Sequence, residues 1–236
     1  MIVVGGGISG LSIALQLKSL GVPKVTVLER HHVGAGQSGR AAGIIRALVN
    51  QTAVASILLE SLRFWNGFNR RFDEGISVNQ PGYLLVERAA RTEVMDQVIR
   101  NAGAAGCEAR RLSQDAAIEL QPGLKLESGD ICAYEPAAIH LDPMVATQAL
   151  ARIVRRMGTE IEEGVEVESI IVDRSRIRGV NTRTACHLAD KVVIATLLPF
   201  VISKVAPGST VTPLDDAMLP APLSSRVPLL MTVAPV

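Results

Sequence analysis

The sequence IVVGGGISG at residues 2–10 runs directly into LSIALQL at residues 11–17, so a short apolar strand leads into a glycine-rich turn and then into a helix. Gly5, Gly7 and Gly10 occupy the glycine positions of the pattern G-x-G-x-x-G. In that pattern the glycines allow a tight turn, a close approach of the backbone to a pyrophosphate, and close packing of the helix on the strand. Because the free N–H groups and the dipole at the start of a helix favour phosphate charge, this stretch predicts a dinucleotide site.

A carboxylate at the end of the next strand supports this interpretation. The second apolar strand, VTVLE at residues 25–29, ends at Glu29, nineteen residues after Gly10. A carboxylate in that place can accept hydrogen bonds from the ribose of an adenosine. The alternative is a glycine-rich turn in an unrelated strand–helix–strand unit, which would leave the position of Glu29 as a coincidence.

The composition is that of a globular protein without a strong charge imbalance. Hydrophobic residues make up 48% of the 236 residues and charged residues 20%, and the net charge of +1 gives no reason to expect a nucleic-acid partner. Cys107, Cys132 and Cys186 are widely spaced, which argues against a disulfide framework or a zinc site and favours a reducing compartment. The N-terminus lacks the pattern of a signal peptide, and the apolar run at 192–203 is shorter than the ~20 residues of a membrane span. We therefore expect a soluble, cytoplasmic protein in which this run forms a buried strand followed by a turn.

Apolar periodicity and turn residues predict alternating helices and strands, with an interruption in the middle of the chain. The predicted helices cover residues 52–72, 89–105, 113–120 (with Ser113 as the N-cap) and 142–157 (starting at Asp142-Pro143). The predicted strands cover residues 83–86, 131–134, 165–172, 176–180 and 190–196. From residue 207 on the chain is rich in proline, and only residues 229–233 have the pattern of a strand.

Four segments together resemble one enzyme family. They are GGGISGLSIA at residues 5–14, VLER at 27–30, GAGQSGRAAG at 34–43 and ADKVVIAT at 189–196. Over roughly residues 1–206, the chain resembles the flavin-dependent amine and amino-acid oxidoreductases of the D-amino-acid oxidase, glycine oxidase and sarcosine oxidase group, which includes the archaeal dye-linked proline dehydrogenase subunits.

The resemblance implies an α/β fold, in which a Rossmann-like FAD-binding domain carries an inserted α+β portion of a substrate domain. The expected parts are residues 1–74 and 140–206 for the FAD-binding domain, residues 75–139 for the inserted portion, and residues 207–236 for the start of an incomplete return to the substrate domain.

FAD, rather than NAD, is the cofactor that the resemblance implies. In this family the loop after the ribose acid passes under the pyrophosphate and the flavin, and Gly34, Gly36 and Gly39 would permit that close approach. An NAD-dependent dehydrogenase needs no such second glycine loop, and an ordinary flexible loop is the other alternative. Val165 or Val167 matches the strand position that contacts the adenine. The residues expected at the cofactor are Gly5, Gly7, Ile8, Ser9, Gly10, Glu29, Arg30, Gly36, Ser38, Gly39, Arg40, Ala41, Ala42, Val167, Ala195 and Thr196.

Arg46 is the catalytic-site residue that the resemblance implies. Relatives in the sarcosine oxidase group carry an arginine near the flavin that holds the substrate carboxylate, and a guanidinium can bind a carboxylate through two parallel hydrogen bonds. A structural ion pair is the alternative for Arg46, and for Arg40 we expect a phosphate-binding or loop-stabilising role. We expect His31 and His32 to be polar neighbours of the adenosine rather than covalent flavin anchors, and Tyr83 to be a packed strand residue rather than part of a substrate pocket.

The implied function is the oxidation of a small amine or amino acid, of the glycine, sarcosine or proline type, by hydride transfer to flavin N5. The expected partner is that small substrate, with a partner subunit or a homo-oligomer left open, and we expect no metal. In this family a downstream segment closes over the flavin, and the chain ends at Val236 without it. The alternative function is therefore a truncated or divergent homologue, or a subunit, that binds a dinucleotide without turnover.

Overall fold

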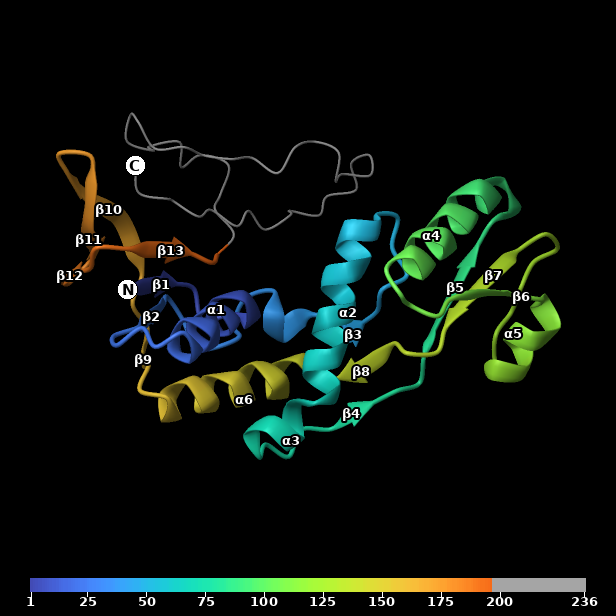
Figure 1. The fold of residues 1–236 in the computed structure, drawn as a ribbon, viewed down its shortest axis with the longest axis horizontal. Helices are drawn as coiled ribbons and strands as arrows, with labels where there is room; N and C mark the ends of the chain where they lie inside the picture. Colours follow the sequence, from blue (N-terminus) through green and yellow to red (C-terminus); the bar gives the residue numbers. More distant parts are fainter. Residues whose placement is uncertain (197–236) are drawn as a thin grey trace. The chain divides into compact units, whose positions relative to one another are not determined.

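A computed structural model describes residues 1–196 of the chain, which form two compact units (Figure 1). The first unit combines Met1–Ala41 with the segment that begins at Pro143, and the second unit is Ala42–Asp142. The predicted strand at 229–233 and the predicted domain portion at 207–236 lie outside the described residues.

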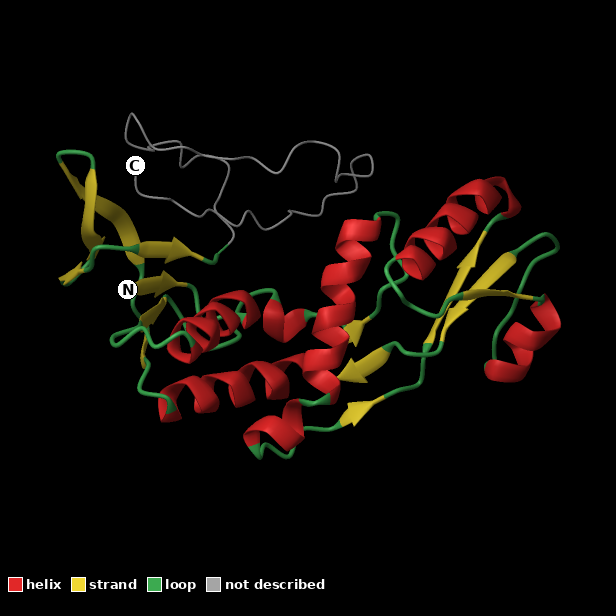
Figure 2. Ribbon diagram, viewed as in Figure 1, coloured by secondary structure: helices red, strands yellow, loops and turns green. Residues whose placement is uncertain are grey.

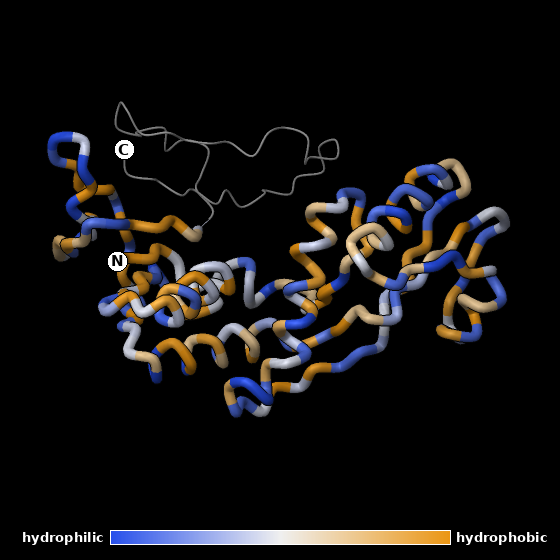
Figure 3. Tube along the Cα trace, viewed as in Figure 1, coloured by the Kyte–Doolittle hydropathy of each residue, from blue (hydrophilic) through white to orange (hydrophobic). Residues whose placement is uncertain are grey.

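The first unit is built on a parallel sheet with the strand order β13-β1-β2-β9. Its strands are β1 (Ile2–Val4), β2 (Thr26–Glu29), β9 (Glu160–Glu163) and β13 (Val192–Ile194). In register, Ile2 lies opposite Thr26 on one side and Val192 on the other. Strand β1, which lies between β13 and β2, is apolar, as Figure 3 shows, because a parallel strand covered on both faces has no solvent-facing side. The predicted α/β fold with a Rossmann-like parallel sheet is confirmed.

Two helices of this unit, α1 (Ile8–Ser19) and α6 (Pro143–Arg156), contact each other, and α1 also packs on β1 and β2. Leu11 and Leu15 of α1 and Leu150 of α6 are fully buried. Helix α1 ends at Ser19, and Gly21, with a φ of +79°, follows its C-cap and donates its N–H to the carbonyl of Lys18 at 3.0 Å. Helix α6 starts at Pro143, as predicted from the fixed φ of proline at a first helical position.

An antiparallel sheet of three strands completes the described part of the first unit. It consists of β10 (Val167–Asp173), β11 (Arg176–Thr182) and β12 (Cys186–Leu188), in that order. Val180 of β11 joins a buried cluster with Ile2, Leu28 and Val192, so this sheet shares a core with the parallel sheet. The strand pattern predicted for residues 165–180 is confirmed, whereas β9 was not predicted.

The second unit holds two small antiparallel sheets and several helices (Figure 2). One sheet has the order β3-β8-β4, and the other has the order β5-β7-β6. Their strands are β3 (Ile44–Ile45), β4 (Val78–Asn79), β8 (Ile139–Leu141), β5 (Tyr83–Glu87), β6 (Arg110–Leu112) and β7 (Ile131–Glu135). The helices are α2 (Thr52–Asn66), α3 (Phe68–Phe72), α4 (Thr92–Ala104) and α5 (Gln114–Leu120). Ser113 caps α5 as predicted, because its hydroxyl accepts the N–H of Ala116 at 3.2 Å.

The single helix predicted for residues 52–72 is wrong in one respect, because the structure divides it at Gly67 into α2 and α3. Gly67 is the C-cap of α2 and the N-cap of α3. The break turns the Phe68 ring to 4.8 Å from the ring of Trp65 and buries it completely. Packing of the aromatic rings therefore outweighs the continuous helical periodicity of this stretch.

The contacts divide the chain after Ala41 and after Asp142, whereas the change in composition suggested residues 75 and 139. The difference arises because β3 pairs with β8 and α2 contacts α4, so that residues 42–74 find their neighbours within the second unit. Which segments make up the FAD-binding and substrate domains stays a prediction.

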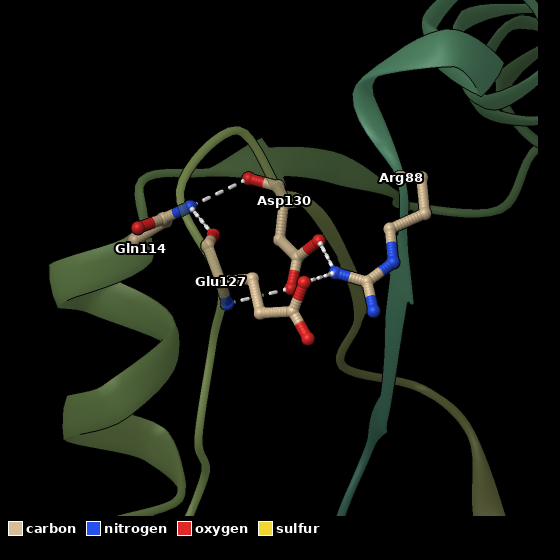
Figure 4. A network of polar contacts seen from close by, with 4 residues as sticks. All are labelled: Arg88, Gln114, Glu127 and Asp130. Carbon is tan, nitrogen blue, oxygen red and sulfur yellow. Dashed lines mark hydrogen bonds and ion pairs between the residues drawn. The ribbon is translucent and has the colours of Figure 1, made fainter.

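A polar network holds the loop between α5 and β7 (Figure 4). Arg88 donates through Nη1 to Glu127 Oε2 at 2.6 Å and to Asp130 Oδ1 at 3.0 Å. Asp130 also accepts the backbone N–H of Glu127 at 2.9 Å, and the amide of Gln114 donates to the carbonyls of Glu127 and Asp130. The two carboxylates raise the pKa of Arg88 above its ordinary value. All four residues are used in closing this loop, so the network is structural.

Candidate functional site

The glycine turn lies at the carboxyl end of β1, between the ends of β2 and β13. Gly5 has a φ of +113°, a conformation that favours glycine. Its N–H donates to the carbonyl of Leu28 at 2.8 Å, and a Cβ atom on Gly5 would lie 2.6 Å from the carbonyl oxygen of Ala195. The structure therefore brings two predicted residues, Ala195 and Thr196, against the turn.

A hydroxyl group from another segment caps the N-terminus of α1. Its N-cap, Gly7, has no side chain to accept a hydrogen bond, and Ser38 Oγ accepts the N–H of Ile8 at 2.9 Å instead. A Cβ atom on Gly7 would lie 2.9 Å from the same hydroxyl, and one on Gly10 would overlap the carbonyl oxygen of Gly5. The first turn of the helix contains no acidic residue, so its N–H groups and dipole favour an anion.

The carboxylate of Glu29 lies beside this turn. Its Oε2 accepts the N–H of Gly6 at 2.7 Å, and its Oε1 accepts the N–H of His31 at 2.9 Å. These two amides orient the carboxylate, and each ionised oxygen has a second lone pair that can accept a further donor. Glu29 thus presents acceptors of the kind that ribose hydroxyl groups need.

The loop after β2 folds back onto the glycine turn. Gly34 donates its N–H to the carbonyl of Gly6 at 3.1 Å, and Gly39 donates to the carbonyl of Gly34 at 3.0 Å. A Cβ atom on Gly39 would overlap that carbonyl and the methyl group of Met144 in α6. Gly36 differs, because no atom lies within 4 Å of the place its Cβ would take. The loop is therefore tightly packed at 34 and 39 and open at 36.

The other predicted cofactor residues are placed more loosely. Five of them are exposed: Ser9, Arg30, Arg40, Ala41 and Ala42. Ala42 belongs to the second unit. Val167 packs against the core cluster of the first unit, whereas the N–H of Val165 donates to the carbonyl of Glu29 at 2.9 Å. Of the two valines considered for the adenine contact, Val165 is the one bonded to Glu29, the residue expected at the ribose. All these assignments stay predictions.

An acidic residue that the sequence pattern did not predict as functional supports the loop. Glu163, at the end of β9, accepts the N–H of Val33 through Oε1 at 2.7 Å. Its other oxygen lies 3.5 Å from Arg155 of α6. The strand reads EIEE, so its apolar pattern is weak, and the available signal was a short acid-rich run between two glycines at 158 and 164.

Arg46 lies in the second unit, directly after β3. Its Cζ atom is 4.6 Å from the centroid of the Tyr83 ring, and its Nη1 donates to the carbonyl of Leu48. Within residues 1–196, Arg46 forms no ion pair with a carboxylate, so the structural ion pair considered as its alternative role is not seen there. A ring face and a carbonyl orient this guanidinium and leave further N–H donors for an anion.

The three cysteines are free thiols. Burial, together with the nearby charge of Glu135, raises the pKa of the Cys107 thiol to about 12, and burial also raises the pKa of Cys132. Both effects disfavour the reactive thiolate. In the part of the chain that the structure describes, no group of three or more His, Cys, Asp or Glu side chains is placed to hold a metal ion. The helices of that part are all too short or too polar to cross a membrane.

Comparison with known proteins adds to this geometry. The family model described as "FAD dependent oxidoreductase" matches residues 1–229. The chain belongs to this family. It is 31% identical over 196 residues to the 4-methylaminobutanoate oxidase (formaldehyde-forming) of Paenarthrobacter nicotinovorans, a match that covers 82% of this chain and 24% of that protein. It is 27% identical over 190 residues to the sarcosine oxidase subunit beta of Rhizobium meliloti (strain 1021), covering 77% of this chain and 45% of that one.

Among solved structures, the L-proline dehydrogenase from P. horikoshii superposes on this chain with a TM-score of 0.77 and 28% identity. The match covers 83% of this chain and 52% of that chain. The chain thus spans between about a quarter and about half of the length of these relatives.

FAD is the cofactor of this family, and the first unit has features that fit it. The turn has room only for glycine at positions 5 and 10, as the tight turn and the close packing of the helix on the strand require. The N–H groups at the start of α1, the hydroxyl of Ser38 and the carboxylate of Glu29 are donors and acceptors of the kind that phosphate and ribose bind. These residues lie in one unit, and they form the candidate FAD site.

Proposed function

We propose that this chain carries cofactor-binding and substrate-binding residues of an FAD-dependent oxidoreductase that oxidises a small amine or amino acid of the glycine, sarcosine or proline type. The names of three relatives support this class, since 4-methylaminobutanoate, sarcosine and proline each combine a secondary amine with a carboxylate. The observation that carries the proposal on this chain is Arg46, a guanidinium held by Tyr83 and Leu48 without an acidic partner among the described residues.

In the proposed site, the carboxylate of Glu29 accepts hydrogen bonds from the ribose hydroxyl groups, and the first turn of α1 binds the pyrophosphate. The hydroxyl of Ser38, which accepts the N–H of Ile8, can also donate its own proton to a phosphate oxygen. Bound FAD supplies the redox chemistry, since its N5 accepts a hydride from the carbon that bears the amine. The residues of this chain bind and orient the reactants.

On the substrate side, we propose that Arg46 binds the carboxylate of the amino acid through two parallel hydrogen bonds. Fixing the carboxylate limits rotation of the substrate and presents one carbon–hydrogen bond for reaction. Loss of the hydride and of the amine proton gives an imine, which water hydrolyses. The geometry calls for no nucleophilic side chain and no paired carboxylates.

A visible absorption spectrum of the purified protein, followed by anaerobic addition of glycine, sarcosine or proline, tests the reaction. We expect flavin absorption bands that are bleached by at least one of these compounds. A bound flavin that none of them reduces would contradict the proposed oxidation and favour a non-catalytic dinucleotide-binding homologue. A protein that takes up no FAD would contradict the assignment of the site itself.

Substitution of Arg46 tests the substrate class. Loss of a hydrogen bond to a charged group costs about 1.5–3 kcal/mol, so Arg46→Ala is expected to raise KM for the amino acid by roughly 10–100-fold without loss of FAD. Arg63→Ala is the matched control, because Arg63 is exposed and pairs only with Glu60 on the same helix among the described residues. An unchanged KM in Arg46→Ala would show that this guanidinium does not hold the substrate.

A further inference from the structure

A buried carboxylate holds the backbone directly after Arg46. The side chain of Glu135, the last residue of β7, is completely buried. It accepts the N–H of Ala47 through both oxygens, at 2.8 and 3.0 Å, and the N–H of Leu48 through Oε2 at 2.8 Å. These are long-range contacts, since 87 and 88 positions separate the partners in the sequence.

The burial of this carboxylate needs an explanation. An ionised carboxylate is costly to bury unless it is paired or well hydrogen-bonded. Among residues 1–196, no Lys, Arg or His lies within ion-pair distance of Glu135. Its donors are the N–H groups of Ala47 and Leu48. The thiol of Cys107 donates to the carbonyl of Glu108 at 3.7 Å, and burial together with the charge of Glu135 raises its pKa to about 12. The hydrogen bonds of Glu135 are therefore concentrated on the segment that follows Arg46.

Both described contacts that orient the Arg46 guanidinium are made with residues that pair with Glu135. The guanidinium donates to the carbonyl of Leu48, and the N–H of the same residue is bonded to Glu135. The guanidinium also lies over the ring of Tyr83, which is the register partner of Glu135 across β5 and β7. One side chain thus fixes the backbone beyond Arg46, while its strand partner provides the surface beneath the guanidinium.

We propose that Glu135 is a positioning residue for carboxylate recognition: it fixes the Ala47–Leu48 backbone so that Arg46, resting on Tyr83, presents its free N–H groups to the substrate carboxylate. The inference rests on the proposed function, in which Arg46 binds that carboxylate. Glu135 does not touch the substrate and takes no part in the redox step.

Glu135→Gln tests the inference in the FAD-bound full chain. The amide has the same shape, but its NH2 group faces a backbone N–H, so one acceptor is lost. With whichever of glycine, sarcosine or proline reduces the flavin, we expect KM to rise about tenfold, which equals the effect of ~1.4 kcal/mol, while kcat changes less than twofold. With the corresponding decarboxylated amine (methylamine, dimethylamine or pyrrolidine), KM should not change.

Three further variants make the result specific. Glu127→Gln alters a surface carboxylate of the same unit and should leave both KM values at the wild-type level. Glu135→Asp keeps the charge on a shorter side chain, so its KM for the amino acid should lie between those of wild type and Glu135→Gln, and it serves in place of Glu135→Gln if that variant does not fold. In the Arg46→Ala background, Glu135→Gln should cause no further rise in KM, because the two residues act through one contact.

The outcomes separate the inference from the proposed function. A wild-type KM in Arg46→Ala overturns the substrate-binding role of that residue. A raised KM in Arg46→Ala with an unchanged KM in Glu135→Gln overturns only the role of Glu135. Equal effects of Glu135→Gln on the amino acid and on its decarboxylated amine, or effects that add to those of Arg46→Ala, also overturn it, because they indicate a general structural role.

Amide hydrogen exchange gives a readout without substrate: exchange of Ala47 and Leu48 should be faster in Glu135→Gln, and unchanged protection there contradicts the inference.

Discussion

Gly5→Ala is expected to destabilise the first unit strongly, because the added methyl group meets a backbone atom that has little freedom to move. The Cβ would lie 2.6 Å from the carbonyl oxygen of Ala195, about 0.9 Å inside the ~3.5 Å of ordinary contact. Ala195 is itself held, because its N–H donates to the carbonyl of Val4 at 2.8 Å. A cost of about 1–3 kcal/mol for this overlap adds to about 1–3 kcal/mol for a non-glycine residue near φ +113°. We expect the free energy of unfolding to fall by about 2–6 kcal/mol.

Gly36→Ala is the matched control in the same unit. No atom lies within 4 Å of its Cβ position, and Gly36 is not among the glycines with positive φ, so its stability should be unchanged or higher by up to about 1 kcal/mol. Urea unfolding should be followed by far-ultraviolet circular dichroism, because the only tryptophan, Trp65, belongs to the second unit. A Gly5→Ala variant within about 0.5 kcal/mol of wild type would refute the close approach of β13 to the turn.

Three other predictions concern the cofactor and the thiols. Glu29→Gln should weaken FAD binding by about 1.5–3 kcal/mol in a flavin titration and more than Glu163→Gln does, and equal losses would contradict the ribose assignment. Gly36→Ala should weaken FAD binding in the same titration while leaving stability intact, and unchanged affinity would show that no close backbone approach occurs there. Iodoacetamide at pH 8 should label Cys186 and leave Cys107 unmodified in peptide mass spectra, because the pKa of Cys107 is raised from 9.0 to about 12. Since this pKa is higher in the folded protein, the protonated thiol contributes to the free energy of unfolding below pH 9, and this contribution is lost as the pH rises towards 12. Rapid labelling of Cys107 in the folded protein would show that its burial is wrong.

The local parts of the fold could be predicted from the sequence. Glycine spacing at the start of the chain predicts the turn that the structure forms, because each glycine meets a local steric limit. The start of α6 at Pro143 and the cap of α5 at Ser113 are confirmed for the same reason, since these signals depend on neighbours within one turn of helix. Glu29 was expected beside the glycines, and its hydrogen bond to Gly6 shows that it is. Its contact with a ribose stays a prediction.

The missed features depend on partners far away in the sequence. Strand β9 exists because it pairs with β2, and its EIEE sequence is too acidic to predict a strand. Glu135 looks like the polar end of a strand, and only the pairing of β7 with β5 and the return of Ala47 show that it is buried. An acidic residue at the end of the otherwise apolar pattern ICAYE was the one available signal, and periodicity alone does not assign it a role.

The insertion of the second unit has a consequence for synthesis of the chain on the ribosome. Strand β1 emerges before the other described strands, but Val192, which pairs with its residue Ile2 in the sheet, follows 190 positions later. At about 5–20 residues per second, β1 waits roughly 10–40 s for β13, and this high contact order slows completion of the sheet. The second unit, by contrast, is one continuous segment from Ala42 to Asp142 and can fold during that delay. Within the described residues, the nascent first unit, with apolar strand edges not yet paired, is therefore the part that we expect to need a chaperone most during translation.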